Sequence, residues 1–290
     1  MKESFSRKAF HVFNYIFMIF LMAVTLYPFI YSLFCSLSSP YDLLAYKGFL
    51  YKPIGFSTAA YRAVMLNPDI YSGFSNTLIV LVTTTALQAV LTLVGAYCLT
   101  RDDAKLVKYL NMGIIFTMYF SGGIVPQYLN IRSLGMDNSL LALIIPQAMS
   151  TYHLIIMKSA FVGVPQSLEE SALLDGAGRL TILFKILTPL VLPNLMVIIL
   201  YAGVHVWNAW FGAMVYLRDR SKFPLQLILR EILLLNKTGA EGNTAVGDTQ
   251  GVAETIQYAT MIVTTVPILL VYPFLQKYFV KGVMVGAVKG

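Results

Sequence analysis

Charged residues are scarce in this chain and missing from long stretches of it. Of 290 residues only 12% are Asp, Glu, Lys or Arg, whereas 57% are hydrophobic. A soluble domain needs more polar surface than this, so the composition indicates a polytopic membrane protein. Six windows contain no charged residue: 9–41, 70–100, 109–131, 138–157, 186–217 and 255–276.

Cysteine and histidine are also rare, with two and three copies. Cys35 and Cys98 fall near opposite ends of their windows, so we expect them on opposite membrane sides, without a disulfide between them. His153 and His205 have no cysteine or carboxylate at a metal-ligand spacing. We therefore expect hydrogen-bonded core histidines and no metal site.

Two further absences exclude classes of activity. The chain has no G-x-x-x-x-G-K-[ST] phosphate loop, so any ATP chemistry must belong to a partner and the chain itself is not expected to be an enzyme. No carboxylate, Lys or Arg lies deep in a window, although such groups usually mark proton or ion relays. This argues against an ion-driven transporter.

Each charge-free window is long enough to cross a bilayer, which takes about 20 apolar residues in a helix. Because backbone groups in lipid must be satisfied internally, the windows should be helices. We therefore predict an all-α integral membrane fold with six transmembrane helices, the first of which is too long for a cleaved signal peptide. The expected spans are 10–37, 72–99, 109–128, 139–158, 187–211 and 256–277.

The basic residues predict the orientation. With both termini inside, cytosolic segments hold 12 of the 21 Lys and Arg residues, at higher density than the longer outer loops. The expected order is a cytosolic N-terminus (1–9), an outer loop (38–71), a membrane core (72–280) and a cytosolic tail (281–290). Membrane orientation accounts for the net charge of +7, so no nucleic-acid partner is needed.

A charged, helix-competent segment interrupts the apolar windows at 161–186. Ser167 and Glu170 form an S-x-x-E capping box, which predicts a helix starting at Ser167. Gly176 and Gly178 should then turn the chain. Two interpretations stay open at this point: a capped helix lying on the inner leaflet, or a docking helix for a cytosolic partner.

The same segment resembles the EAA loop of permease subunits of ATP-binding-cassette (ABC) importers. Glu170-Ser171-Ala172 stands in place of E-A-A, and Gly176 follows at the motif's spacing. After nine intervening residues comes Ile186-Leu187-Thr188-Pro189 in place of I-x-L-P. The ATPase-coupling residues that the resemblance implies are Glu169, Glu170, Ser171, Ala172, Asp175, Gly176 and Ala177.

The C-terminal sequence QKYFVKGVMVGAVKG resembles the ending of MalG-like, carbohydrate-type permeases, in the branch with lipoprotein-anchored binding proteins. That resemblance implies a type I importer in the bacterial cytoplasmic (inner) membrane. Its other parts would be a second homologous permease subunit, two ATP-binding subunits that hold ATP-Mg, and an extracellular solute-binding protein. This chain would need no cofactor of its own.

The resemblance also implies two further contact regions. The tail, with Gly286, Lys289 and Gly290, would reach the ATPases. The glycine-rich run before the last span has the composition of a flexible exposed loop. In the family this loop contacts the binding protein, here through Asn236, Gly239, Gly242, Asn243 and Gly247.

Polar residues recur along two of the expected spans. Asn194, Tyr201, His205 and Asn208 fall within one sector of the fifth span, and Gln88 belongs to a similar stripe on the second. These five residues could line a sugar pathway, where amides and hydroxyls bind sugar hydroxyls. They could equally serve helix packing, since polar residues concentrate at helix contacts in bilayers.

Taken together, these features predict a permease subunit of an ATP-driven importer for sugars or oligosaccharides, working by alternating access. One alternative is another small solute, such as an amino acid or an anion, carried by the same importer class. The other is a stand-alone secondary transporter.

Overall fold

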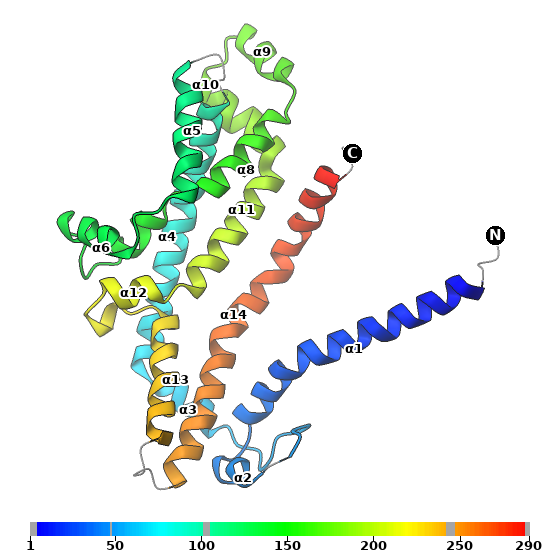
Figure 1. The fold of residues 1–290 in the computed structure, drawn as a ribbon, viewed down its shortest axis with the longest axis vertical. Helices are drawn as coiled ribbons and strands as arrows, with labels where there is room; N and C mark the ends of the chain where they lie inside the picture. The colour runs from blue at the N-terminus through cyan, green and yellow to red at the C-terminus, as the bar shows by residue number, and fades with distance from the viewer. Residues whose placement is uncertain (1–4, 47, 101–104, 242–246, 288–290) are drawn as a thin grey trace. The chain divides into compact units, whose positions relative to one another are not determined.

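The computed structural model describes residues 5–46, 48–100, 105–241 and 247–287. Side chains at 5–6, 9, 105, 235–241, 247–250, 271–272 and 274–287 lie outside the description. The described residues are helical or irregular, without a strand (Figure 1). They group into two compact units, one made of Met1–Pro68 with Leu229–Val266 and the other of Asp69–Ile228 with Pro267–Gly290.

The first unit begins with α1 (Phe5–Ser36), followed by the short helices α2 (Pro40–Ala45) and α3 (Ala59–Leu66). The expected outer loop 38–71 therefore contains helical turns. Hydrogen bonds fasten it to the end of α1: Ser36 Oγ lies 2.7 Å from Tyr61 OH, and the Ile54 amide donates to Ser38 Oγ at 3.0 Å. These bonds satisfy polar groups where the chain leaves the apolar helix.

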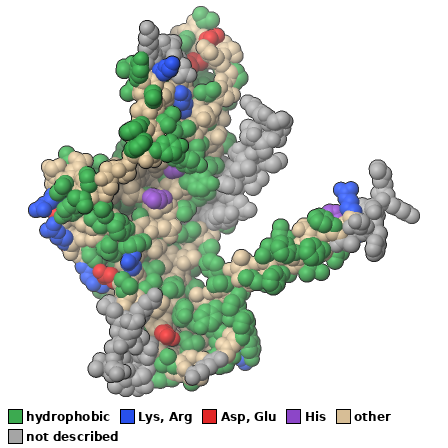
Figure 2. Space-filling view, in the orientation of Figure 1, with side chains coloured by type: hydrophobic (Ala, Val, Ile, Leu, Met, Phe, Trp, Pro, Cys, Tyr) green, Lys and Arg blue, Asp and Glu red, His purple; other side chains and the backbone are tan. Residues whose placement is uncertain are grey.

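In α1 itself the residues from Phe10 to Ser36 form a strongly apolar run, and none of its most apolar 18-residue window is buried. Large side chains such as Phe13, Ile16 and Phe20 are exposed on it. Figure 2 shows this helix as almost continuous green. A helix that is apolar on all sides needs lipid or another protein around it, as expected for a membrane span.

The second unit holds most of the remaining helices. They are α4 (Pro68–Leu99), α5 (Lys105–Tyr119), α6 (Ile124–Ser133), α7 (Leu141–Ile144), α8 (Thr151–Val162), α9 (Gln166–Leu174), α10 (Arg179–Thr181), α11 (Thr188–Asn208) and α12 (Phe211–Tyr216). Two more, α13 (Leu225–Glu241) and α14 (Gly247–Ala287), have residues in both units. A buried apolar cluster, with Leu154, Met157 and Ile182 almost fully covered, packs α4, α8 and α11 together.

The span count differs from the six predicted. Among the described residues, four helices are long and apolar enough to cross a membrane, or five if the bent pair α7–α8 is one span. The expected continuous helix over 109–128 is wrong, because α5 ends at Tyr119 and α6 begins at Ile124. Between them Gly123 has φ +84°, which a helix cannot contain. The 15 residues of α5 extend only about 22 Å.

The fourth predicted span is broken as well. Its first part, Leu141–Gln147, meets Thr151–Val162 at an angle of 41°. Pro146 lies just before the break, and proline removes one helical hydrogen bond. Ser150 restarts the helix as the N-cap of α8, accepting a hydrogen bond from the His153 amide.

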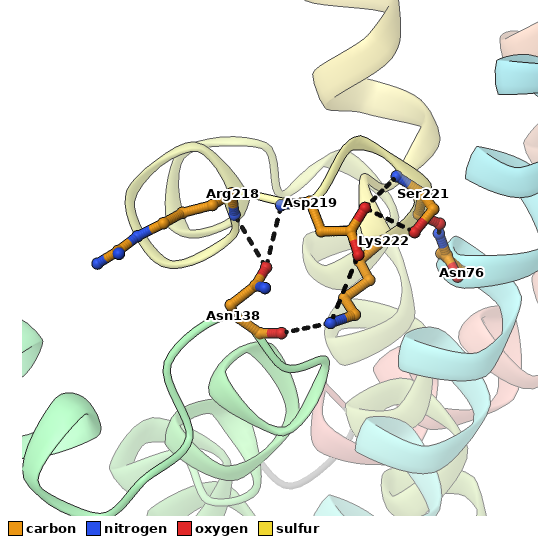
Figure 3. Close-up of polar contacts among 6 residues, drawn as sticks. All are labelled: Asn76, Asn138, Arg218, Asp219, Ser221 and Lys222. Carbon is orange, nitrogen blue, oxygen red and sulfur yellow. Dashed lines mark hydrogen bonds and ion pairs between the residues drawn. The ribbon is translucent and has the colours of Figure 1, made fainter.

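A polar network joins Asn138, which precedes α7, to the segment after α12 (Figure 3). Asn138 adopts φ 54°, and its Oδ1 accepts from the backbone amides of Arg218 at 3.1 Å and Asp219 at 3.0 Å. Lys222 Nζ donates to the Asn138 carbonyl at 2.9 Å. Asn76 on α4 donates to the Ser221 carbonyl at 2.8 Å. Asn138 thus holds together two segments that lie about 80 residues apart in the sequence.

We expect Asn138→Ala to lower the free energy of unfolding by about 2 kcal/mol. The change removes the acceptor oxygen that receives both backbone hydrogen bonds, and alanine tolerates positive φ less well than asparagine does. Asn138→Asp keeps the acceptor oxygen and serves as the matched control. Thermal unfolding in detergent measures both, and equal midpoints for Asn138→Ala and the unsubstituted protein would contradict the role assigned to Asn138.

Candidate functional site

The charged segment predicted to interrupt the membrane core forms a compact helical turn at one end of the second unit, where α9 and α10 lie together (Figure 1). The helix α9 begins at Gln166, with Pro165 as its N-cap and no side-chain hydrogen bond at that cap among the described residues. The predicted capping box is therefore wrong. The Leu168 amide already bonds to the Pro165 carbonyl, so Ser167 lies inside the first turn.

The end of α9 explains the Asp-Gly-Ala triplet. Gly176 has φ +77°, and its amide donates to the Leu173 carbonyl at 3.0 Å. The Ala177 amide donates to the Ala172 carbonyl at 2.9 Å. These two bonds form a Schellman motif, which requires a residue that accepts positive φ, as the sequence predicted for a turning glycine. Buried Ala172 and half-buried Ala177 pack on the same apolar cluster as α4 and α8.

The two adjacent glutamates of α9 have different surroundings. Glu169 is half-buried, and its Oε1 accepts a hydrogen bond from Tyr97 OH at 2.9 Å. The same oxygen lies 3.7 Å from Nη1 of Arg179 in α10. Glu170 is exposed. The first glutamate therefore fastens α9 to the end of α4, while the second faces outward.

The outward surface of this segment combines acidic and apolar side chains. Asp175 is exposed like Glu170, and Leu174 between them is 89% exposed. Leu168 and Leu180 are also exposed. We call Leu168, Glu170, Leu174, Asp175 and Leu180 the docking surface. This segment therefore exposes both leucine and carboxylate side chains.

The segment continues directly into α11 through a π-helical turn, Ile182–Leu187. Pro189 in the next turn has no amide hydrogen to donate, and the Thr188 hydroxyl bonds to the Leu183 carbonyl at 2.7 Å. π-Turns are often found at functional positions. Residues Arg179–Asn208 form one continuous 30-residue element, so a displacement of α10 reaches α11 without an intervening loop.

A cavity of about 600 Å³ lies between α4, the α7–α8 break and α11. We call it the histidine cavity. Figure 2 shows histidine side chains, in purple, at a hollow of the face in view. Three of the predicted pathway residues, Gln88, Tyr201 and His205, line it. Asn194 and Asn208 are not among its lining residues, and Asn208 Nδ2 instead donates to the Val204 carbonyl of its own helix at 2.8 Å.

The cavity also contains residues that the sequence analysis missed, namely Gln147, Ser150 and Tyr152. His153 lines it too, with only 9% of the residue exposed. Its Nδ1 is buried without a hydrogen-bond partner among the described residues, so the expectation of a hydrogen-bonded core histidine is wrong. Sequence spacing could not bring His153 and His205 together, because they are far apart in the chain. The signal that was available is the Pro146–Ser150 stretch inside a charge-free window, which indicates a break in the helix.

The remaining predicted contact residues are only partly described. Gly242, Asn243, Lys289 and Gly290 lie outside the described residues. Asn236 and Gly239 fall on α13, and Gly247 and Gly286 on α14, where only the backbone is described. Helix thus covers part of the run expected to be a loop, because a nucleated helix gains one hydrogen bond for each residue added.

Two curated proteins of Bacillus subtilis (strain 168) are similar to the whole chain. The polygalacturonan/rhamnogalacturonan transport system permease protein YtcP is 38% identical over 285 residues, which cover 98% of this chain and 99% of YtcP. Protein LplC is 36% identical over 294 residues, covering 100% and 98%. No protein-family model matches the chain.

Solved structures show the same fold. A chain of a bacterial ABC transporter involved in the import of the acidic polysaccharide alginate superposes with a TM-score of 0.87 at 29% identity, covering 96% of this chain and 99% of that one. A chain of the bacterial alginate ABC transporter in complex with an alginate pentasaccharide-bound periplasmic protein gives a TM-score of 0.57 at 15% identity. The second likeness concerns the fold alone.

The contact between Tyr97 and Glu169 can be tested by Tyr97→Phe, which removes only the hydroxyl group. We expect backbone amides of residues 166–174 to exchange hydrogen about tenfold faster, since one hydrogen bond to a carboxylate is worth about 1.5 kcal/mol. Tyr109→Phe, at an exposed position of α5, is the matched control. Unchanged exchange in α9 for Tyr97→Phe would show that other contacts hold this helix.

Proposed function

This chain belongs to the permease subunits of sugar ABC importers, and from that premise we propose that it forms one half of the membrane pathway of an ATP-driven oligosaccharide importer. YtcP and LplC, both above 30% identity over nearly the full chain, support the family assignment. The continuous connection from the docking surface to the histidine cavity carries the proposal about mechanism.

In the membrane we propose six spans with both termini in the cytosol. The four long apolar helices and the α7–α8 pair account for five of them. The sixth would be α5, completed at its outer end by the extended residues 120–123. Broken helices inside a membrane are compatible with this arrangement where protein or a water-filled cavity surrounds them. The membrane is proposed to be the bacterial cytoplasmic membrane.

The docking surface is proposed to contact one of two cytosolic ATP-binding subunits, which bind ATP-Mg and hydrolyse it. Its carboxylates would face basic groups of the partner, and its exposed leucines would enter an apolar groove. The tail residues Gly286, Lys289 and Gly290 are proposed as a second contact with the ATPases. A second, homologous permease would complete the pathway.

Outside the membrane, a solute-binding protein would deliver the cargo. A solved chain with the same fold belongs to a bacterial alginate ABC transporter in complex with an alginate pentasaccharide-bound periplasmic protein. Residues Asn236, Gly239, Gly242, Asn243 and Gly247 are proposed to contact it. Sugar cargo follows from the relatives; an amino acid, an anion, or transport by this chain alone are the alternatives to be tested.

The proposed mechanism is alternating access driven by differential binding of ATP. ATP favours the closed ATPase dimer, and a ligand shifts an equilibrium only through such a preference. Closure would move α9, and Glu169 would pass the movement to α4 through Tyr97. The π-turn would pass it to α11, whose residues Tyr201 and His205 line the histidine cavity. The cavity would then open to the opposite side.

We expect Gly176→Val to uncouple ATP hydrolysis from uptake. Gly176 has φ +77°, and a β-branched side chain at this φ costs about 2 kcal/mol of conformational free energy. The segment relieves this strain when the turn after α9 changes its conformation. Uptake in proteoliposomes containing the whole importer should fall about tenfold while the chain remains in the membrane. Gly178→Ala is the matched control, because Gly178 has φ −67° and open space around it. Normal uptake by Gly176→Val would count against the coupling role.

The docking partner can be captured by crosslinking from Leu174, the most exposed leucine of the docking surface. In a Cys98→Ser background, which removes the exposed native thiol, Leu174→Cys carrying a photoreactive group should yield an adduct with an ATP-binding subunit in native membranes. Leu134→Cys, 62% exposed and on the predicted outer side, is the control and should give none. Recovery of lipid adducts alone from position 174 would refute the importer assignment.

A further inference from the structure

The described lining of the histidine cavity contains several polar side chains but no carboxylate. The polar side chains of its described lining are those of Gln88, Gln147, Ser150, Tyr152, His153, Tyr201 and His205. None is a carboxylate, and all but the two tyrosines and the serine are amides or imidazoles. Such groups offer N–H donors, which are the natural partners of an anionic oxygen. A site for a cation would be expected to include carboxylates instead.

The backbone at this cavity also favours an anionic ligand. The helix α8 is 12 residues long and begins at the break in its span. Its N-cap Ser150, which accepts from the His153 amide, and the first-turn residues Tyr152 and His153 line the cavity. The first turn of a helix has amide hydrogens without partners inside the helix and carries a partial positive charge. Discontinuous membrane helices in transporters direct such ends at anionic groups of their substrates.

Two buried side-chain atoms at this place have no partner. His153 is nine-tenths buried, and its Nδ1 forms no hydrogen bond within the described residues. Gln147 donates through Nε2 to the Leu143 carbonyl, while its buried Oε1 has no donor among the described residues. A buried polar group without a partner costs about 1–3 kcal/mol. An incoming ligand that both accepts and donates hydrogen bonds would satisfy the two atoms together.

We propose that the histidine cavity binds the carboxylate and neighbouring hydroxyl of a uronic-acid unit in an oligosaccharide. The carboxylate would accept from His153 and from the start of α8, with His205 and Gln88 as further donors. A sugar hydroxyl would donate to Gln147 Oε1. This inference rests on the proposed function and narrows its cargo to acidic sugars.

The dimensions favour a sugar over a small inorganic anion. A volume of about 600 Å³ falls in the range of cavities for organic ligands, which run from about 300 to 1,000 Å³. Tyr152 and Tyr201 add aromatic rings to the lining, against which the apolar face of a pyranose packs. An inorganic anion would leave those surfaces and most of the volume without contacts.

The test compares two cargoes with the same sugar chain, trigalacturonate and its methyl ester, in which each carboxylate is neutralised by a methyl group. Proteoliposomes contain the whole importer with its binding protein, so every variant receives each cargo through the same delivery step. We expect His153→Leu to reduce ATP-driven uptake of trigalacturonate by about tenfold or more, as for loss of a hydrogen bond to a charged group. Uptake of the methyl ester should change less than about twofold.

Further variants separate recognition from folding. His205→Leu should lower the trigalacturonate-to-ester ratio in the same direction, and His153→Gln, which retains an N–H donor, should restore part of it. His11→Leu makes the same substitution at the exposed histidine of α1 and should leave the ratio unchanged. ATPase activity stimulated by the loaded binding protein reports whether each complex is assembled.

The outcomes distinguish this inference from the proposed function. Equal losses for both cargoes, or an unsubstituted importer that carries only the neutral ester, would overturn acidic-sugar recognition and leave the importer assignment in place. If the unsubstituted complex carried no oligosaccharide in response to ATP, the proposed function itself would fail, and this inference with it.

Discussion

Inside a bilayer the polypeptide has no water to hydrogen-bond, so every departure from helix needs its own source of partners. Three such departures within the described residues have an identifiable local solution. Gly123 accepts positive φ after α5, Ser150 caps the restart at α8, and the Thr188 hydroxyl bonds to a carbonyl in the π-turn. The helices themselves are generic. The positions of the breaks distinguish this structure, and residues at the breaks contribute to the candidate site.

The breaks also explain how one chain can connect two distant regions. The Schellman turn at Gly176 reverses the chain after α9, so that Glu169 of α9 and Arg179 of α10 lie near each other and Tyr97 meets the same carboxylate. The π-turn then joins α10, which carries Arg179, to α11 without a flexible loop. A continuous helical element transmits a displacement that a loop would absorb. The second half of α11 lines the histidine cavity.

Much of the architecture was accessible from composition and local pattern. Long charge-free windows predicted helices at 72–99 and 187–211, and the structure has α4 (Pro68–Leu99) and α11 (Thr188–Asn208) there. The glycine turn at Gly176 was predicted because few residues other than glycine suit that conformation. The errors occurred where local rules competed. Ser167 looked like a cap, but Pro165 started the helix earlier, and the window at 109–128 did not reveal that Gly122 and Gly123 would end α5.

The sequence by itself determined the membrane class, the helical character of the long windows and the place of the charged segment at 161–186, because hydropathy, glycine conformation and motif spacing act over short distances along the chain. Only the tertiary structure decided which polar residues share a space. His153 and His205 line one cavity, Asn208 turns back to its own helix, and Glu169 rather than Glu170 is held by Tyr97. Those outcomes depend on helix rotation and on the angle at each break, which follow from packing among residues far apart in the sequence.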